Sequence, residues 1–259
     1  MKNIGITILK HLIEHPLTRG LSVDDPQTTL LRRNIIQKKA FLHALYSEWY
    51  LRLVTALPNK GTVLELGSGA GFFSDFRTEV ITSDIIPTPN NQLVVDACRL
   101  PFPDDVLVGI VMTDVFHHIP DVKSFINEAT RCVRPGGKVL MIEPWRTNWS
   151  QWIYTRLHSE PFIPSAGWDI PQSGPLSGAN GALPWIVFER DHKIFEENYP
   201  NWQVVNVELM MPFCYLVSGG VSCRSLIPGW TYNFIRRLEQ QLDQKRWALF
   251  AFIELKLRY

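Results

Sequence analysis

The sequence predicts an α/β fold in which a doubly wound, largely parallel sheet is flanked by helices. Five short apolar runs alternate with helical stretches, and a glycine-rich turn follows the first run directly. Such alternation is typical of parallel strands joined by crossover helices. The five predicted strands cover residues 62–66, 80–84, 93–96, 108–113 and 138–143.

Helical patterns flank these strands. Apolar residues recur every three to five positions over 28–57, which predicts one or two amphipathic helices that end at Pro58. Residues 121–133 have the pattern of a crossover helix, and Gly136 and Gly137 lie just beyond it. After residue 200 the pattern predicts a strand at 203–210, a helix at 228–244 and a strand at 247–257.

Residues 144–200 interrupt this order with prolines and five of the nine tryptophans. The segment is too long for an ordinary connection, and long insertions of this kind are commonly lids or binding loops. Because strand-like segments follow it, we interpret it as an insertion within one domain. We expect at least one of its tryptophans to lie near the pocket.

Composition excludes several classes of protein. Of the 259 residues, 46% are hydrophobic; 26 are basic and 25 acidic, so the net charge is +1. This balance gives no support to a nucleic-acid partner or to a disordered chain. No apolar run is long enough to span a membrane, and the N-terminus does not read as a signal peptide. The four cysteines lack the spacing of a zinc site or a disulfide framework, so we expect no metal and a cytoplasmic location.

The glycine-rich turn over residues 63–71 carries most of the functional signal. Its glycines stand at 67, 69 and 71, whereas a dinucleotide fingerprint would need glycine at 72, where this chain has Phe72. The Lys-Ser/Thr ending of a phosphate-binding P-loop is also missing. Alternate glycines after a strand allow a ligand to approach the backbone closely.

Carboxylates follow the glycines at informative positions. Asp84 ends the second strand and can accept both hydroxyls of a ribose. Asp96, beside Ala97, can read the edge of an adenine, and Glu65 can take a cationic amino group. Each could alternatively cap a turn or lie in solvent, but together with the glycines they indicate an adenosine-containing ligand.

Residues 60–145, about a third of the chain, resemble the class I S-adenosylmethionine-dependent methyltransferases. They are most similar to the type 11-like group, which includes small-molecule and quinone methylases, and more loosely to bacterial members of unassigned substrate, some associated with surface-polysaccharide synthesis. The matching segments are ELGSGAG from Glu65, TSD ending at Asp84, DACRLPF from Asp96, DVFHH from Asp114 and RPGGK from Arg134.

The resemblance implies a Rossmann-like, doubly wound sheet of seven strands whose last strand is antiparallel. It implies one methyltransferase domain, divided into an N-terminal helical cap (1–57), a cofactor-binding core (58–143), an acceptor-side insertion or lid (144–200) and C-terminal strands and helix (201–259). The cofactor would be S-adenosyl-L-methionine, released as S-adenosyl-L-homocysteine.

The resemblance also implies which residues bind that cofactor. The glycine loop would face its methionine part, Asp84 its ribose and Asp96 with Ala97 its adenine, while the carbonyl of Asp114 would meet its amino group. The full predicted set is Glu65, Gly67, Ser68, Gly69, Gly71, Asp84, Ile85, Asp96, Ala97 and Asp114.

Two histidines after the fourth strand are the candidates for a general base. His118 is preferred and His117 is second, because both lie at the sheet edge where ligands bind in open α/β folds. Either could instead cap a turn or pack against the cofactor. Polar and aromatic residues expected on the acceptor side are Glu143, Trp145, His158, Glu160 and Arg190; for Arg190 a surface ion pair with Asp191 is an equal alternative.

These observations favour methyl transfer to a small-molecule, sugar-linked or lipid-linked acceptor, with oxygen as the expected target. The alternatives are carbon methylation of a quinone-like or polyketide-like acceptor, and a partner protein that binds the cofactor without turnover. Peripheral membrane contact, through the first apolar segment (4–12) or the Trp-rich insertion, is a further alternative. The oligomeric state stays open.

Overall fold

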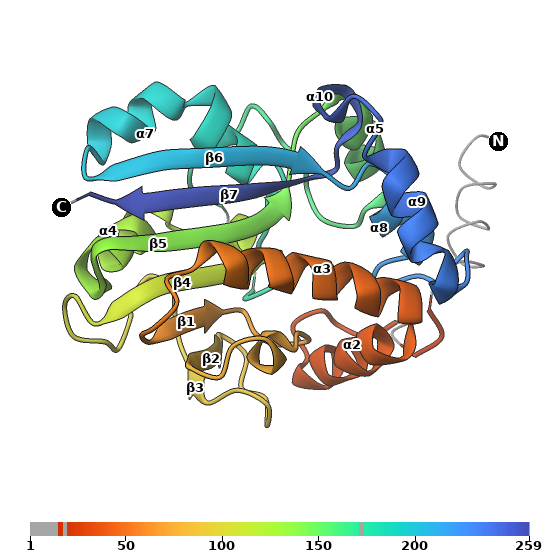
Figure 1. Cartoon of the computed structure of the whole chain (residues 1–259), viewed down its shortest axis with the longest axis horizontal. Coiled ribbons are helices and arrows are strands. Elements are labelled where there is room, and N and C mark those ends of the chain that lie inside the picture. Colours follow the sequence, from red (N-terminus) through yellow and green to blue (C-terminus); the bar gives the residue numbers. More distant parts are fainter. Residues whose placement is uncertain (1–14, 18–19, 171–173, 259) are drawn as a thin grey trace.

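A computed structural model describes residues 15–17, 20–170 and 174–258, which form a seven-stranded sheet with helices on both faces (Figure 1). The strand order is β3-β2-β1-β4-β5-β7-β6. The strands are β1 (Val63–Leu66), β2 (Val80–Asp84), β3 (Leu93–Val94), β4 (Leu107–Thr113), β5 (Val133–Pro144), β6 (Trp202–Met210) and β7 (Phe250–Leu257).

The helices and helical turns fall into three groups along the chain. Those before the sheet are α2 (Pro26–Lys38) and α3 (Ala40–Ala56), and those between its parallel strands are η1 (Phe73–Asp75), η2 (Phe116–His118) and α4 (Val122–Cys132). The insertion contains α5 (Asn148–Leu157), α6 (Leu183–Trp185), η3 (Ile186–Arg190) and α7 (His192–Asn198). The C-terminal part contains α8 (Cys214–Ser218), η4 (Gly229–Thr231), α9 (Tyr232–Glu239) and α10 (Gln244–Trp247).

The strand directions confirm the predicted topology. Strands β1 to β5 are parallel to their neighbours, whereas β7 is antiparallel to both β5 and β6. Nearly all residues of the central strands β1 and β4 are buried because helices cover both faces of the sheet. Helix α3 supplies much of this cover, since Leu45, Trp49 and Leu53 are almost completely buried.

Local capping explains where several elements begin. The Asp25 side chain accepts the N–H of Gln27 and starts α2 with Pro26 in its first turn. Asp121 caps α4 in the same way through Ser124. Asp243 caps α10 through Lys245, so the last strand begins at Phe250 and not at 247 as the pattern predicted.

Other boundaries also differ from the sequence prediction. Strand β3 has two residues because Asp96 turns the chain, its side chain accepting the N–H of Cys98. Strand β5 begins at Val133, earlier than predicted. The helix predicted over 228–244 is divided into η4 and α9. The apolar segment 4–12 lies outside the described residues, and the division into a cap, core, insertion and C-terminal part stays a prediction.

All four cysteines are free thiols. Within the described ranges, no helix is both long and apolar enough to cross a bilayer.

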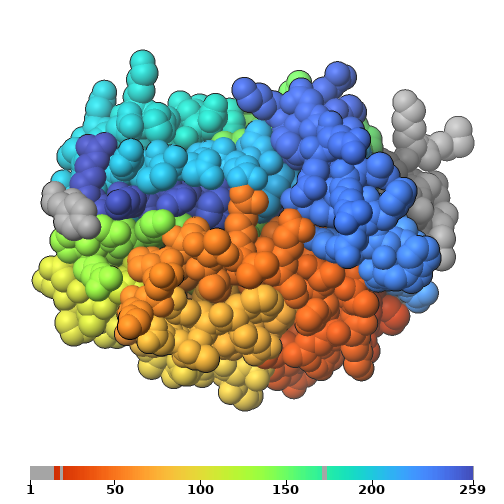
Figure 2. All heavy atoms as spheres, in the orientation of Figure 1, coloured from red at the N-terminus to blue at the C-terminus, as the bar shows by residue number. Residues whose placement is uncertain are grey.

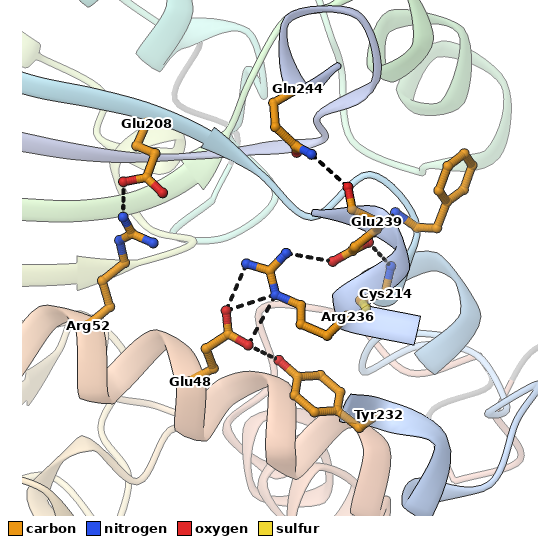
Figure 3. A network of polar contacts seen from close by, with 9 residues as sticks. Glu48, Arg52, Glu208, Cys214, Tyr232, Arg236, Glu239 and Gln244 are labelled. Atoms are coloured by element: carbon orange, nitrogen blue, oxygen red, sulfur yellow. Dashed lines mark hydrogen bonds and ion pairs between the residues drawn. The ribbon is translucent and has the colours of Figure 1, made fainter. Parts of the chain in front are cut away.

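A buried polar network fixes α9 to α3 (Figure 3). The guanidinium of Arg236 pairs with Glu48 on α3 at 2.8 Å and with Glu239 at 3.0 Å. The other oxygen of Glu239, whose side chain is 2% exposed, accepts the N–H groups of Phe213 and Cys214 at 2.9 Å each. Glu239 therefore joins the end of α9 to the start of α8.

We expect Glu239→Ala to lower the free energy of unfolding by about 2–5 kcal/mol, because two N–H groups lose their acceptor and the buried guanidinium of Arg236 loses one of its two carboxylate partners. Urea denaturation followed by circular dichroism measures this. Glu197→Ala on α7, where the side chain is exposed, is the matched control. Equal midpoints for the two variants would contradict the structural role of Glu239.

Candidate active site

A cavity of about 540 Å³ lies at the carboxyl edge of the parallel strands. The glycine loop after β1, the end of β2 and the turn after β4 form its floor. Helices α2 and α3 form one wall, and residues 174–178 of the insertion form another. This is the sheet edge at which open α/β folds bind ligands.

Packing accounts for the glycines in the loop after β1. Gly67 has φ +69°, and a Cβ there would lie 2.3 Å from a methyl carbon of Val115. A Cβ on Gly69 would lie 2.8 Å from the Asp84 carboxylate, and one on Gly71 would lie 2.5 Å from the Tyr50 hydroxyl. Side chains at these positions would collide with the cavity wall, so the backbone itself faces the cavity.

Asp84 lies at the end of β2 with both carboxylate oxygens oriented by the backbone. One oxygen accepts the N–H of Gly69 at 3.0 Å and the other the N–H of Ile86 at 2.9 Å. Each oxygen keeps a further lone pair for a ligand. Burial raises the pKa of Asp84 despite these hydrogen bonds.

Glu65 is buried at the end of β1 and lines the cavity. The Ser68 hydroxyl donates to its carboxylate at 2.7 Å, and the N–H of Ser83 donates to that hydroxyl at 3.0 Å. Burial raises the pKa of Glu65 to about 7. Ser68 does not line the cavity; it supports Glu65 and β2 from behind.

The adenine-side prediction concerns residues on the rim of the cavity. Ile85, Asp96 and Ala97 all line it, and Ile85 is 43% exposed. Asp96 uses one oxygen to accept the N–H of Cys98, which fixes the turn after β3. An apolar side chain, a backbone N–H and a carboxylate are therefore available at this rim.

Asp114 directly follows β4 and has φ +63°, a conformation that non-glycine residues rarely adopt. Its N–H donates to the carbonyl of Ile142 at 2.8 Å, and it lines both the large cavity and a small neighbouring cavity of about 20 Å³. Burial raises the pKa of its carboxyl to about 7. Strained backbone at such a position is typical of functional sites.

Glu143 determines the shape of the turn that follows Asp114. One of its oxygens accepts the N–H groups of Val115 and Phe116, both at 2.8 Å, and the other lies 2.8 Å from Nδ1 of His117. The Glu143 side chain is fully buried and does not line either cavity. It was predicted on the acceptor side, but it lies in the core behind the cavity wall, where it holds the turn after β4 in place.

His117 lies between two carboxylates. Its second ring nitrogen, Nε2, is 3.3 Å from Glu160 of the insertion. Burial alone would lower the pKa of His117, but hydrogen bonds to Glu143 and Glu160 outweigh burial and hold the pKa well above its usual value. The same contact holds the pKa of Glu160 well below its usual range, although burial opposes this shift. His117 is therefore a charged link between the sheet and the insertion.

His118 lines the cavity, and its ring has a different protonation state from that of His117. Its Nδ1 is 3.1 Å from the carbonyl of Gly178, and because a carbonyl only accepts, Nδ1 carries the proton. Burial, together with the charge of His117, lowers the pKa of His118 to about 4. The ring is neutral at pH 7, and its Nε2 has a lone pair that can accept a proton.

His117, His118 and Glu160 also form a cluster whose ligand atoms lie within 4.8 Å of one another, the arrangement in the described part of the chain that could hold a metal ion. Glu160 already pairs with the charged ring of His117 in this cluster. The sequence expectation that the protein uses no metal stays a prediction.

Of the four other residues predicted on the acceptor side, two line a cavity and two do not. Glu160 lines both cavities and His158 lines the small one. Trp145 is buried in the core and lines neither. Arg190 also lines neither, because it pairs with Asp191 and donates to the carbonyls of Pro164 and Ala166. No tryptophan in the described part of the chain lines either cavity, and the expectation of one near the pocket stays a prediction.

The sequence interpretation missed the wall built by the N-terminal helices. Thr29 and Arg32 of α2, and Tyr46 and Tyr50 of α3, line the cavity. The Nε atom of Arg32 is buried and has no hydrogen-bond partner among the described residues. The helical spacing of 29, 32 and 36 could have suggested a shared face, but nothing local showed which element that face would cover.

Asp24 connects the segment before α2 to the insertion. A carboxylate oxygen of Asp24, just before α2, accepts the N–H groups of Leu176 and Ser177 at 2.7 and 3.0 Å. The segment before α2 is thereby joined to the insertion, and Val23 and Leu176 both line the cavity. The two ends of the wall come from segments about 150 positions apart in the sequence.

Comparison with known proteins finds methyltransferases. A family model described as a methyltransferase domain matches residues 38–166. Demethylmenaquinone methyltransferases from Lysinibacillus sphaericus and Staphylococcus epidermidis are 30% and 32% identical to the chain over 98 residues. Each match covers 38% of this chain and only 39–40% of the curated relative.

Solved structures share the fold at low identity. Geranyl diphosphate C-methyltransferase from Streptomyces coelicolor superposes with a TM-score of 0.52 and 12% identity, covering 95% of this chain and 89% of that one. A SAM-dependent methyltransferase from Archaeoglobus fulgidus gives 0.51 and 13%, covering 83% and 94%.

Fold, family match and site together identify the class: the chain belongs to the class I S-adenosylmethionine-dependent methyltransferases. The cavity suits the cofactor of that class. A glycine-rich loop, a carboxylate with spare lone pairs and a rim that includes the apolar Ile85 lie in one cavity, as an adenosine with a methionine tail requires.

The ionised contact between His117 and Glu160 predicts a pH-dependent stability. We expect Glu160→Gln to lower the free energy of unfolding by about 1–3 kcal/mol near pH 6. Glu160 has a lowered pKa, so its contribution is present above the unfolded value of about 4.3 and is lost as the pH falls. His117 has a raised pKa, so its contribution is present below about 6.5 and is lost as the pH rises through the folded value.

Urea midpoints measured across this pH range test the prediction. The difference between wild type and Glu160→Gln should shrink below about pH 4. Glu196→Gln on α7 removes an exposed carboxylate that pairs with His192 and is the matched control. A difference that stays constant with pH would contradict an ionised Glu160.

Proposed function

We propose that this protein transfers a methyl group from S-adenosylmethionine to a hydroxyl oxygen of a small acceptor. The observation that supports this proposal is His118, a neutral histidine whose proton-accepting nitrogen is available in the same cavity as the glycine loop and Asp84. Transfer to oxygen requires that a proton leave the acceptor, and a positioned histidine is the commonest side chain for that task.

On the cofactor side, we assign the ribose to Asp84 and the adenine to Asp96, Ala97 and Ile85. The amino group would lie near Glu65 and the backbone of Asp114. We add Arg32 to this set, because its buried Nε without a partner suits the cofactor's carboxylate. When bound, S-adenosylmethionine supplies a methyl group that is already activated on sulfur, so the protein mainly orients the acceptor and excludes water.

On the acceptor side, the wall beside His118 is largely apolar. Ile119, Pro120, Ile170 and Leu176 line it, and Arg32 is the basic residue on the cavity wall in the described ranges. This lining suits an acceptor with an apolar body, such as a lipid-linked intermediate or a compact aromatic alcohol, better than a free sugar phosphate. Glu160 would contact its polar end.

A second candidate is carbon methylation of a quinone-like acceptor. It is favoured by the similarity to demethylmenaquinone methyltransferases and by the same apolar wall. Removal of a hydroxyl proton from the reduced ring would activate the neighbouring carbon, so His118 would have the same role in both reactions.

A labelled methyl donor separates these candidates. The protein is incubated with S-adenosylmethionine carrying a deuterated methyl group and with lipid, polar, protein and nucleic-acid fractions of a bacterial extract. We expect label on oxygen of a lipid or small molecule, located by mass spectrometry and NMR. Label on carbon would establish the second candidate, and label confined to protein or nucleic acid would contradict both.

The same assay tests His118. We expect His118→Ala to lower the rate of label transfer by about 10²–10⁴-fold, the usual worth of a general base. Affinity for S-adenosylmethionine, measured by calorimetry, should stay within about twofold of wild type because His118 would act on the acceptor. His192→Ala, at an exposed position on α7, is the control. A parallel loss of rate and cofactor affinity would demote His118 to a structural role.

Asp84 gives a test that needs no acceptor. We expect Asp84→Ala to weaken S-adenosylmethionine binding by about 10–100-fold, because hydrogen bonds to a charged group are worth about 1.5–3 kcal/mol. Calorimetry measures the affinity, and circular dichroism confirms the fold. Asp75→Ala, at an exposed carboxylate on η1, is the control. Unchanged affinity would remove the ribose assignment.

A further inference from the structure

We propose that the outward face of α9 and of the turn before it is a docking surface for an anionic lipid membrane. This surface is defined by Leu226, Trp230, Phe234, Leu238 and Arg237. It does not use the cavity, and it does not depend on which acceptor is methylated.

The first observation is that α9 buries two charged residues, Arg236 and Glu239, and exposes two large apolar ones, Phe234 and Leu238. Arg236 and Glu239 are buried against α3 in the network of Figure 3, together with the Tyr232 hydroxyl, which donates to Glu48 at 2.5 Å. At 100° per residue, Phe234 and Leu238 therefore lie on the opposite side of the helix. Surface helices of soluble proteins normally show the reverse arrangement.

The second observation is the degree of exposure. Trp230 is 84% exposed, Phe234 66%, Leu226 65% and Leu238 49%. Single exposed apolar residues are common on protein surfaces, whereas several large ones grouped together mark an interaction site. Figures 1 and 2 show this blue segment at the end of the molecule away from the C-terminus.

The charges near this surface indicate which partner it fits. Between residues 224 and 246, the exposed charged side chains are Arg224, Arg237, Lys245 and Arg246 against Asp243 alone. This local excess of +3 stands out in a chain whose net charge is +1. Basic residues beside exposed aromatic and leucine side chains are the composition with which peripheral proteins bind anionic lipid headgroups. A second copy of the same face would instead bring like charges together.

Exposed aromatic and basic side chains are also found on the neighbouring helix α5. Trp152 of α5 is 45% exposed, stacks on Trp149 and lies under the guanidinium of Arg156 at 5.2 Å. Trp149 in turn contacts Trp247 of α10, the helix that follows α9. Tryptophan and arginine together suit the boundary between headgroups and acyl chains, where one end of each side chain is apolar and the other polar. Trp152 would thus contact the same membrane.

Vesicle co-sedimentation of the full chain tests the proposal. The probes are vesicles of phosphatidylcholine alone and vesicles made of phosphatidylcholine and phosphatidylglycerol in equal parts. We expect at least about tenfold tighter binding to the anionic vesicles, weakened by high salt. The double variant Trp230→Ser/Phe234→Ser and the single variant Arg237→Glu should each lose about tenfold or more. Ile194→Ser, at a 50% exposed position on α7 at the other end of the molecule, should bind like wild type.

Several outcomes would overturn the proposal. Wild type that binds neither vesicle, or α9 variants that bind as wild type does, would remove the membrane surface. Light scattering that shows a dimer for wild type and a monomer for the double variant would assign the face to self-association instead. Circular dichroism and S-adenosylmethionine calorimetry confirm that each variant is folded, so a failure of the proposed methyl transfer remains distinguishable from a failure of membrane binding.

Discussion

The hydrogen bonds of Glu143 are the constraint on which the rest of the site depends. A carboxylate buried at the end of β5 accepts two backbone N–H groups from the turn after β4 and also holds His117. Leaving such groups without partners in the core would cost several kcal/mol, so the turn has few alternative conformations. This one side chain fixes the strained Asp114 before the turn and directs His118 into the cavity.

The insertion and the segments before the sheet supply the remaining contacts of the site. Glu160 reaches the charged ring of His117, Gly178 orients the neutral ring of His118, and Asp24 holds residues 176 and 177. Two adjacent histidines thereby acquire opposite protonation states, because one lies between two carboxylates and the other faces an apolar wall. Separating the states of similar groups in this way is how proteins assign different chemical roles to them.

The outward surface of α9 also depends on how buried charges pair with one another. Glu48, Arg236 and Glu239 satisfy one another inside the fold, which leaves the outer side of the helix to large apolar residues and Arg237. The proposed acceptor side of the cavity is also apolar. An enzyme that meets a membrane at one end and encloses an apolar acceptor in its cavity would suit a lipid-linked substrate.

From the sequence alone, the periodicity predicted the parallel strands and crossover helices, and the resemblance of its motifs to a known family implied seven strands with an antiparallel last strand, which the structure confirms. The glycine loop and Asp84 predicted a cofactor site because they are local signals close together in the chain. The sequence did not determine the roles of Glu143, Arg32 and Ser68, nor that Trp145 and Arg190 would lie away from the cavity. Those roles depend on contacts between segments far apart in sequence, such as Asp24 with Leu176 and Glu160 with His117. Only the tertiary structure decided them, since burial and protonation are properties of a folded environment and not of a residue's neighbours in the chain.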